Sequence, residues 1–384
     1  MAGTLSLGLL LFRLGSLMRG TSSAEFIFQQ HYASLGVIAH NPANLPLLLV
    51  HWLVGLWAPL NAFWLRVPSV FFAALTLAAL AYVLRRWYGI RTAILTFALF
   101  ACSAWLLHVS RSSTADIMYL FMLPMLYLAH VAVHSHNKSR AALYLWLVIQ
   151  AMLLYIPGGI WFVLLNAFLQ RSEILAAIKY LGSWLNKIGF VLATAILLTP
   201  LVTGLLIGSS TAVGLNLLGL PTALPNISET VHRAAEVLLF VAVRGNASDA
   251  LWLNHLPLLD AFVTVVFLAG AYFYAKHRRA SRTKLLFGSL FIGVILLSLG
   301  GPITIGILVP GLFLIAAAGI AYLLHLWLAV FPRNPVARGI GIGLLSVAVA
   351  VSCLYGVRQY FVAWAHHLPA RTSFTQHEIV RPKL

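Results

Sequence analysis

The sequence predicts an all-α, polytopic integral membrane protein with about 11 transmembrane helices and an interfacial helix in its first external loop. Of the 384 residues, 61% are hydrophobic and only 9% are charged, whereas a soluble domain has about 25% charged residues. The apolar residues also gather in runs close to the roughly 20 residues that cross a bilayer as a helix. A water-soluble core could not bury this much apolar sequence, so we expect residues 1–384 to form a single transmembrane unit.

The expected crossings are the apolar runs, taken in chain order. They are residues 4–18, 65–84, 92–108, 117–134, 141–156, 159–170, 188–207, 257–275, 285–300, 303–330 and 339–362. The stretch 46–60 is also apolar, but Pro46, His51 and Pro59 interrupt it. We therefore expect an interfacial or re-entrant helix there, not a full crossing.

The basic residues predict the orientation of these spans. The formal net charge is +17, and Lys and Arg concentrate in alternate loops, which is the positive-inside pattern. With a cytoplasmic N-terminus, the internal loops contain Arg85, Arg86, Arg91, Lys138, Arg140, Arg171, Lys179, Lys187, Lys276, Arg278, Arg279, Arg282, Lys284, Arg333 and Arg338. This pattern explains the charge without a nucleic-acid partner. The short loops favour a bacterial plasma membrane, with the endoplasmic reticulum as the alternative.

Three regions then face the external side: residues 19–64, 109–116 and 208–256. In the first of them, residues 23–37 are expected to form an amphipathic interfacial helix, which Ser22 or Ser23 can cap. The polar, basic tail 366–384 is expected to be loosely ordered.

Two of the eight acidic residues, Glu25 and Asp116, stand at the external ends of apolar runs. A carboxylate within a bilayer costs roughly 2.5–3.5 kcal/mol at a helix centre, so acids beside lipid are rare unless they are used. We expect the two carboxylates to meet at one membrane face beside Arg66 and Arg111. The structural alternatives are that Glu25 only starts an interfacial helix and that Asp116 only caps the helix that follows it.

The motifs around these acids follow a specific order. The first span and Glu25 precede a His-Asn-Pro segment at 40–42 and the interfacial helix. The next span opens with Leu65-Arg66-Val67-Pro68-Ser69, ends with Leu84-Arg85-Arg86-Trp87-Tyr88-Gly89 and precedes Val109-Ser110-Arg111-Ser112-Ser113-Thr114-Ala115-Asp116. In this order and spacing the chain resembles the GT-C glycosyltransferases of the protein O-mannosyltransferase and aminoarabinose-transferase type (glycosyltransferase family 39 and its bacterial relatives). The resemblance covers roughly residues 1–170, and the remainder matches in hydropathy alone.

The resemblance implies a transferase that uses a polyprenyl-phosphate sugar as donor and a glycan, lipid or protein as acceptor. It assigns Glu25 as the general base or acceptor-positioning acid and Asp116 as the second acid. Relatives commonly have an Asp-Glu pair where this chain has Ala24 and Glu25, so Glu25 acts alone or the activity is altered. Relatives of this branch work without a metal, and two carboxylates without a third ligand make a weak metal site. We therefore expect no metal, with a divalent ion held between acidic residues, as in other GT-C enzymes, as the alternative.

Transfer from a lipid phosphate also needs cations that stabilise the leaving group. Arg66 and Arg111 are the first candidates, because a guanidinium gives phosphate two directed hydrogen bonds, and His40 and His51 lie nearby in the sequence. The structural alternatives are that Arg66 anchors its span at the headgroups, that Arg111 pairs with Asp116, and that the histidines only pack.

Two other functions stay open on the sequence alone. One is a lipid or sugar transporter or flippase, although the key charges stand at span ends and no internal repeat is evident, unlike in transporters. The other is a non-catalytic membrane protein of the same fold, which the alanine at position 24 keeps open.

Overall fold

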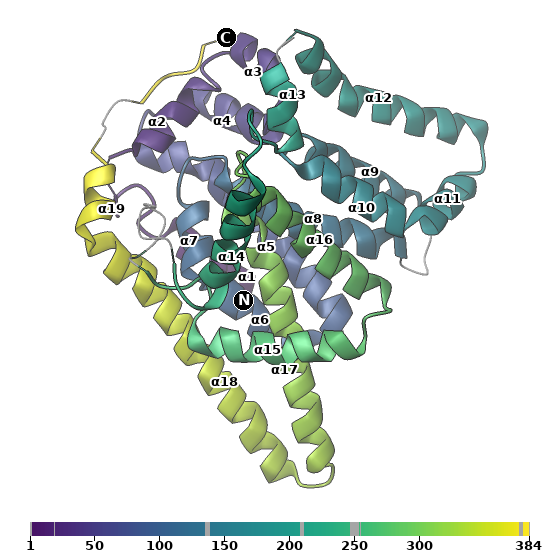
Figure 1. Ribbon diagram of the computed structural model, residues 1–384, viewed down its shortest axis with the longest axis vertical. Coiled ribbons are helices and arrows are strands. Elements are labelled where there is room, and N and C mark those ends of the chain that lie inside the picture. The colour runs from purple at the N-terminus through teal and green to yellow at the C-terminus, as the bar shows by residue number, and fades with distance from the viewer. Residues whose placement is uncertain are drawn as a thin grey trace.

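The computed structural model describes residues 2–18, 20–134, 139–207, 211–245, 253, 255–375 and 379–383. Within these ranges the regular elements are helices, and the β structure is one isolated bridge between Ser34 and Lys383. Figure 1 shows the helices packed around α5, α8 and α17, with the α17–α18 hairpin projecting at the bottom. The prediction of an all-α, polytopic membrane protein is confirmed.

Six helices are long and apolar enough to cross a membrane by length and composition. They are α5 (Ala62–Tyr88), α8 (Asp116–His134), α12 (Trp184–Ile207), α16 (Ser281–Ser298), the run of η1 (Ile305–Ile307) into α17 (Val309–Val330), and α18 (Pro335–Arg358) with the π-helical η2 (Gln359–Trp364). Two bent pairs raise the number to eight. They are α6 (Ile90–Ala101) with α7 (Ala104–Ser110), bent by 59°, and α10 (Gly159–Leu169) with α11 (Arg171–Tyr180), bent by 74°.

The three remaining predicted spans coincide with shorter helices. These are α1 (Ala2–Leu11), α9 (Arg140–Leu154) and α15 (Ala261–Lys276), with 10, 15 and 16 residues. All three are shorter than the roughly 20 residues of a full crossing. The described residues therefore support six to eight crossings, and the count of about 11 stays a prediction. The segment 208–256, predicted to be an external loop, contains α13 (Thr211–Leu218) and α14 (Ile227–Ala242) in its described part.

The loop predicted to be the first external one contains three helices, α2 (Ser23–Gln30), α3 (Leu35–His40) and α4 (Leu45–Trp57). The prediction of one helix over 23–37 is wrong, because the chain breaks before Ser34, whose hydroxyl accepts from Val37 N at 3.3 Å and caps α3. Ser22 caps α2 through a reciprocal capping box with Glu25. That box places the Glu25 carboxylate at the start of α2.

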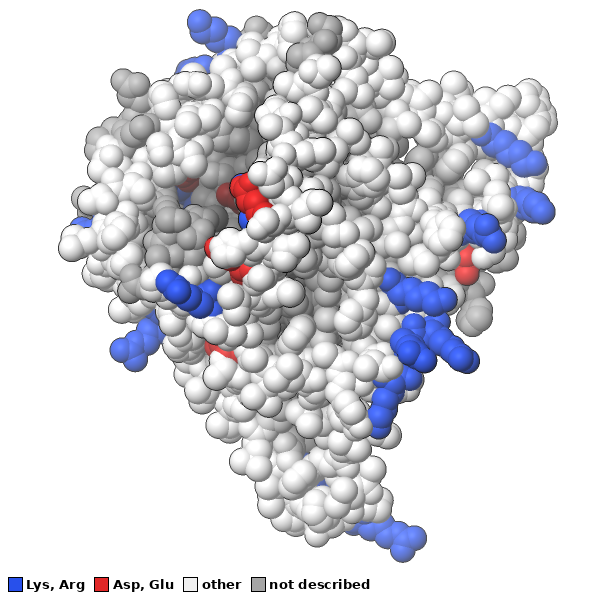
Figure 2. Space-filling view, in the orientation of Figure 1, with Lys and Arg blue, Asp and Glu red and all other residues white. Residues whose placement is uncertain are grey.

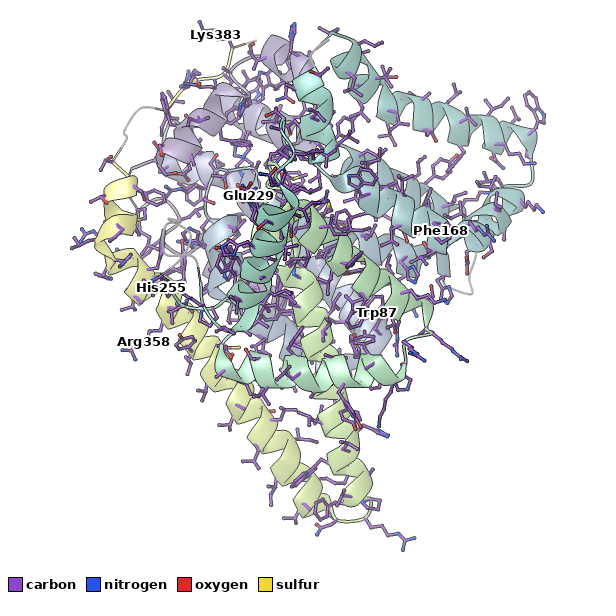
Figure 3. The ribbon with its side chains drawn as sticks, viewed as in Figure 1. Trp87, Phe168, Glu229, His255, Arg358 and Lys383 are labelled. Atoms are coloured by element: carbon purple, nitrogen blue, oxygen red, sulfur yellow. The ribbon has the colours of Figure 1, made fainter. Side chains whose placement is uncertain are left out.

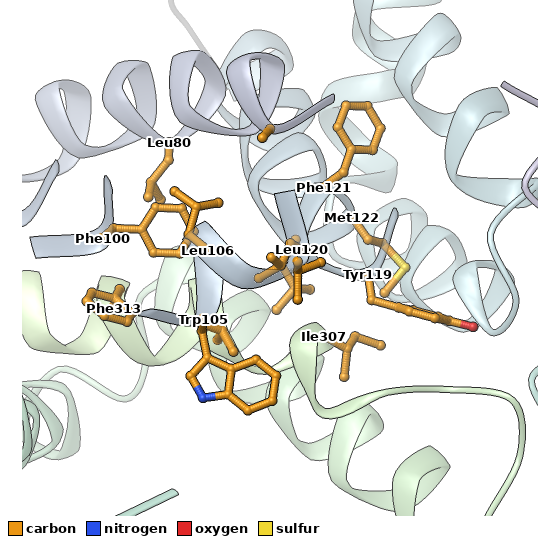
Figure 4. Packing of buried hydrophobic residues seen from close by; sticks show 14 of the residues in the cluster. Leu80, Phe100, Trp105, Leu106, Tyr119, Leu120, Phe121, Met122, Ile307 and Phe313 are labelled. Carbon is orange, nitrogen blue, oxygen red and sulfur yellow. The ribbon is translucent and has the colours of Figure 1, made fainter. Parts of the chain in front are cut away.

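A continuous apolar core supports the bend between α6 and α7. Phe72 of α5 packs edge-on against Phe121 of α8 with ring centroids 5.3 Å apart, and Phe100 of α6 packs in the same way against Phe313 of α17 at 5.2 Å. Figure 4 shows Phe100, Phe121 and Phe313 in this core together with Leu80, Leu106 and Leu120. Aromatic packing of this kind adds to burial energy, and the buried residues Trp105, Leu106 and Leu107 of α7 belong to the same core.

Close backbone contact between α15 and α17 depends on two glycines. A Cβ at Gly270 would lie 1.8 Å from Ile315 O, and a Cβ at Gly319 would lie 1.8 Å from Val266 O. Small residues at such crossings let helix backbones touch in a membrane protein. The crossing holds α17 in the middle of the bundle, where residues 309–320 are all buried.

The described part of the C-terminal tail contacts the helices of residues 23–57, a contact that the sequence did not predict. It contains α19 (Leu368–Ser373), and Val380 N donates to Gln29 Oε1 of α2 at 2.9 Å. Lys383 N donates to Ala33 O at 2.7 Å, and Trp52 Nε1 donates to Lys383 O at 3.0 Å. Figure 3 shows Lys383 at the top of the molecule, far from Trp87, which lies in the last turn of α5.

Candidate functional site

Glu25 and Arg66 form a buried ion pair that joins α2 to α5. Their side chains are 0% and 2% exposed. Arg66 Nε donates to Glu25 Oε1 at 2.9 Å, and Arg66 Nη2 donates to Glu25 Oε2 at 3.0 Å. This is the bidentate arrangement that gives the strongest arginine–carboxylate pairs. The sequence therefore predicted correctly that these two residues lie side by side, but not that they would be fully buried.

The remaining N–H groups of the Arg66 guanidinium donate to backbone carbonyls. Nη1 donates to Leu14 O at 3.2 Å and to Met18 O at 3.0 Å, and Nη2 also donates to Gly20 O at 2.9 Å. These carbonyls are within reach because α1 ends at Leu11, whereas the apolar run predicted a span to residue 18. All five N–H groups of Arg66 are engaged, so Arg66 anchors this segment in the conformation described here.

Glu25 also reaches the turn that precedes α8. Its Oε1 accepts from Ser113 N at 2.9 Å, and its Oε2 accepts from Ser22 N at 3.0 Å. With the two bonds from Arg66, both carboxylate oxygens are held by two donors each. Glu25 is thus the residue at which α2, α5 and the turn over 111–116 meet.

Asp116 stands at the start of α8, three residues after Ser113. It is half-buried, and its Oδ2 accepts from Thr114 Oγ1 at 2.8 Å. Of the two candidate acids, Asp116 is therefore the more accessible. Within the described ranges, no group of three or more His, Cys, Asp or Glu side chains is arranged to hold a metal ion.

Arg111 lies at the end of α7 and is 4% exposed. Its Nε donates to Tyr360 Oη at 3.1 Å, and its Nη1 donates to Leu9 O at 3.1 Å and Leu10 O at 2.7 Å. These bonds, and not a pair with Asp116, hold the side chain. Its guanidinium carbon also lies 5.4 Å from the ring centroid of Tyr360 and 5.0 Å from that of Phe361. Nη2 is buried and has no hydrogen-bond partner among the described residues.

Arg66 and Arg111 line one small cavity, of about 10 Å³. The other residues that line this cavity are Leu14, Leu17, Met18, His108, Ser112, Tyr360, Trp364 and Phe374. An adjoining cavity of about 20 Å³ shares His108, Tyr360 and Trp364 with it. A space of 10–15 Å³ holds about one water molecule, so side chains nearly fill the region between the two arginines in this conformation.

Four residues of this site escaped the sequence-based prediction. His108 precedes Arg111 by three residues on the same helix, so helical spacing places both on one face and was the available signal. Tyr360, Trp364 and Phe374 come from the C-terminal part of the chain. The Trp364 ring packs edge-on against His108 at 4.1 Å, and Phe374 lies 5.6 Å below the Arg66 guanidinium carbon. Nothing in the sequence around them indicates these contacts.

The structure does not bring His40 and His51 to the arginines. His40 is exposed at the end of α3, where its Nδ1 lies 2.6 Å from Gly36 O. His51 is 2% exposed and stacks on Tyr32 with ring centroids 5.0 Å apart. It lines a separate cavity beside Pro382. Burial lowers the pKa of His51 to about 3, so its ring is neutral near pH 7 and lacks the charge that attracts phosphate.

Replacing His51 with phenylalanine is expected to reduce the loss of stability on acidification. The pKa is lowered from 6.5 to about 3 in the folded protein. As the pH falls below 6.5 the unfolded chain therefore binds a proton that the folded chain does not. That difference destabilises the wild type by about 2 kcal/mol at about pH 5. The measurement is the free energy of unfolding in one detergent at about pH 7.5 and pH 5. His40→Phe, at an exposed site, should retain the wild-type slope, and an equal slope in His51→Phe would contradict the prediction.

No known family model matches the sequence, and no curated protein matches it. Among solved structures, the apo crystal structure of ArnT from Cupriavidus metallidurans matches with a TM-score of 0.60 and 14% sequence identity, covering 97% of this chain and 76% of ArnT. The crystal structure of ArnT bound to undecaprenyl phosphate matches with a TM-score of 0.48 and 14% identity, over 94% of this chain and 76% of that one. The first match shows that the all-α fold predicted from the sequence is shared with this ArnT structure. The chain has the fold of ArnT over almost its whole length.

Proposed function

We propose that this protein is a membrane glycosyltransferase that moves a sugar from a polyprenyl-phosphate donor to a hydroxyl-bearing acceptor at the extracytoplasmic face. The fold shared with ArnT and the order of the motifs support a transferase. The single observation that carries the site is the Nη2 group of Arg111. This group is buried and has no hydrogen-bond partner among the described residues. Arg111 also lines the cavity beside the Glu25–Arg66 pair. A buried guanidinium with an unused donor is a ready partner for an anion.

The proposed reaction is a single displacement at the sugar. The acceptor oxygen attacks C1 as the bond between C1 and the phosphate oxygen breaks. The acceptor proton passes to a carboxylate, and the polyprenyl phosphate leaves with the bonding electron pair. One general base is enough for a direct displacement, and the charge that develops on the leaving phosphate is stabilised by a cation placed beforehand.

The contact with phosphate is proposed first for Arg111, because Arg66 is fully engaged. Arg66 contributes its charge next to the same cavity, and it gains a direct contact only by exchanging one of its present bonds. His40 and His51 lie outside this cavity, so the proposal gives them no contact with the donor phosphate.

Glu25 is proposed as the general base and Asp116 as the second catalytic acid. Because Arg66, Ser22 and Ser113 now occupy both oxygens of Glu25, its use as a base requires one of these bonds to break. A donor phosphate that draws the Arg66 guanidinium toward itself would release a Glu25 oxygen. Asp116 is half-buried and requires a smaller change to meet an acceptor.

Donor entry also requires the C-terminal segment to move. The cavity of about 10 Å³ does not hold a sugar phosphate, and Phe374 and Trp364 form part of its wall. Both residues lie near α19, a six-residue helix. A helix this short has little stability of its own, so moving it costs little free energy. We place this opening before the chemical step.

The test is the release of polyprenyl phosphate from a polyprenyl-phosphate sugar by the purified protein in vesicles. Transfer to an added acceptor supports the proposal, whereas movement of labelled lipid across the bilayer without release would favour a flippase and overturn it.

Arg111→Gln should weaken the binding of a polyprenyl phosphate by about 10- to 100-fold, since hydrogen bonds to charged groups contribute about 1.5–3 kcal/mol. The measurement is a binding titration in one detergent. Arg338→Gln, at an exposed position at the start of α18, is the matched control and should bind as the wild type does. Equal affinity in Arg111→Gln would remove Arg111 from the site.

A further inference from the structure

A cavity lies far from the acids, in a seam between α1, α5 and α6. It has a volume of about 630 Å³, within the 300–1,000 Å³ that is usual for small-molecule sites. Figure 1 shows the three helices together near the middle of the molecule. By the orientation of the basic loops, this seam opens on the cytoplasmic half of the bundle.

Small side chains make the seam hollow. α5 contributes Ala74 and Ala78 to one wall, and α1 contributes Gly3, where an added Cβ would meet no atom within 4 Å. Ile94 and Phe97 of α6 form the opposite wall. The lining is therefore mostly apolar, with Thr4 and Ser6 of α1 as its polar residues away from the Tyr82 and Arg85 end, and it suits an acyl chain.

The seam has a cationic end. Arg85 is the one charged residue of its lining, and it is exposed in the last turn of α5. Arg86 follows it, donates from Nε to Tyr82 Oη at 3.3 Å and lies 5.6 Å over the Tyr82 ring, and Tyr82 lines the seam. Figure 2 shows a group of Lys and Arg side chains at the lower right of the molecule. An anionic headgroup complements this end.

The length of the seam matches one leaflet. From Ala74 to Arg85 the rise along α5 is about 16 Å at 1.5 Å per residue, close to half of the roughly 30 Å hydrocarbon core. An acyl chain in the seam would therefore reach the bilayer centre while its phosphate lay at Arg85.

We infer that this seam is a specific binding site for an anionic glycerophospholipid of the cytoplasmic leaflet. The acyl chain lies between α1, α5 and α6, and the phosphate binds Arg85. The site is separate from the acids near Arg66, because Arg66 and Arg85 stand near opposite ends of α5, and it does not depend on the proposed transferase activity.

The test is the amount of lipid retained by the purified full chain after exchange into vesicles of phosphatidylglycerol, of phosphatidylcholine or of a mixture, measured by native mass spectrometry. We expect the wild type to prefer phosphatidylglycerol by about 10-fold or more, and Arg85→Gln to lose that preference. Arg279→Gln removes an exposed arginine from the basic loop 276–284, outside the seam, and should keep the preference. Equal retention of both lipids by the wild type would mean that the seam holds only bulk lipid.

A second variant tests the apolar part of the seam. Ala78→Trp fills it from an exposed position on α5, and Ala195→Trp makes the same change on the exposed face of α12. We expect only Ala78→Trp to abolish the bound phosphatidylglycerol. Bound lipid that survives Ala78→Trp, or a stronger preference of the wild type for polyprenyl phosphate than for phosphatidylglycerol, would overturn the inference. If Ala78→Trp does not fold, the wild type and Arg85→Gln still decide it.

Discussion

Replacing Arg66 with methionine is expected to lower the free energy of unfolding by about 3–5 kcal/mol, the usual effect of removing one partner from a buried ion pair. Glu25 is fully buried and would lose two hydrogen bonds, while the carbonyls of Leu14, Met18 and Gly20 would lose their donor. A carboxylate without its cation is far more costly in this position than in water. The measurement is denaturant unfolding of the purified protein in one detergent at constant lipid content.

The controls separate the ion pair from a general loss of side-chain volume. The double variant Glu25→Gln with Arg66→Met leaves no buried charge and should recover part of the loss. Arg66→Lys keeps the charge but not the five-donor fork, so it should be intermediate. Arg233→Met breaks an exposed pair with Glu229 on α14 and should change stability by less than about 0.5 kcal/mol. A change of that size in Arg66→Met would show that the buried pair is not a structural anchor.

Hydropathy predicted the long helices because a segment that crosses lipid has to be apolar over about 20 consecutive residues. The run 65–84 lies inside α5, and the run 117–134 lies inside α8. The ends of elements depend on contacts that the local sequence does not contain. The helix predicted over 23–37 divides near Tyr32, whose ring is buried against His51 of α4. Neither the periodicity nor the capping residues indicate that tertiary contact.

The charged part of the site was predictable because few charged residues stand beside apolar runs, and each needs a partner. Glu25, Arg66 and Arg111 were predicted in this way. The hydrogen bonds from Arg66 to the carbonyls that follow Leu11 were not predicted, since an apolar run does not show that α1 ends at that residue. The contacts of Tyr360 with Arg111 and of Phe374 with Arg66 could not be predicted either, because they join segments that are more than 200 residues apart in the sequence.

If Glu25 is the general base, Glu25→Gln will lower kcat for sugar transfer by about 10²- to 10⁴-fold. Glutamine keeps the size of the side chain and one acceptor oxygen but cannot take the acceptor proton. The affinity for polyprenyl phosphate should change less than kcat, since the phosphate contact is proposed for Arg111. Because the variant also leaves Arg66 without its carboxylate, kcat has to be referred to the folded fraction, measured by size-exclusion chromatography and thermal unfolding.

The pH–rate profile distinguishes the two acids. A general base must be deprotonated, so kcat/KM of the wild type should fall on the acidic side of the optimum. Glu25→Gln should remove this acidic limb from whatever activity remains, whereas Asp116→Asn should lower the rate and keep the limb. The opposite result, with the limb lost only in Asp116→Asn, would make the more accessible Asp116 the base. Glu25 would then serve through its bonds to Arg66 and Ser113, which hold the turn before α8 in place.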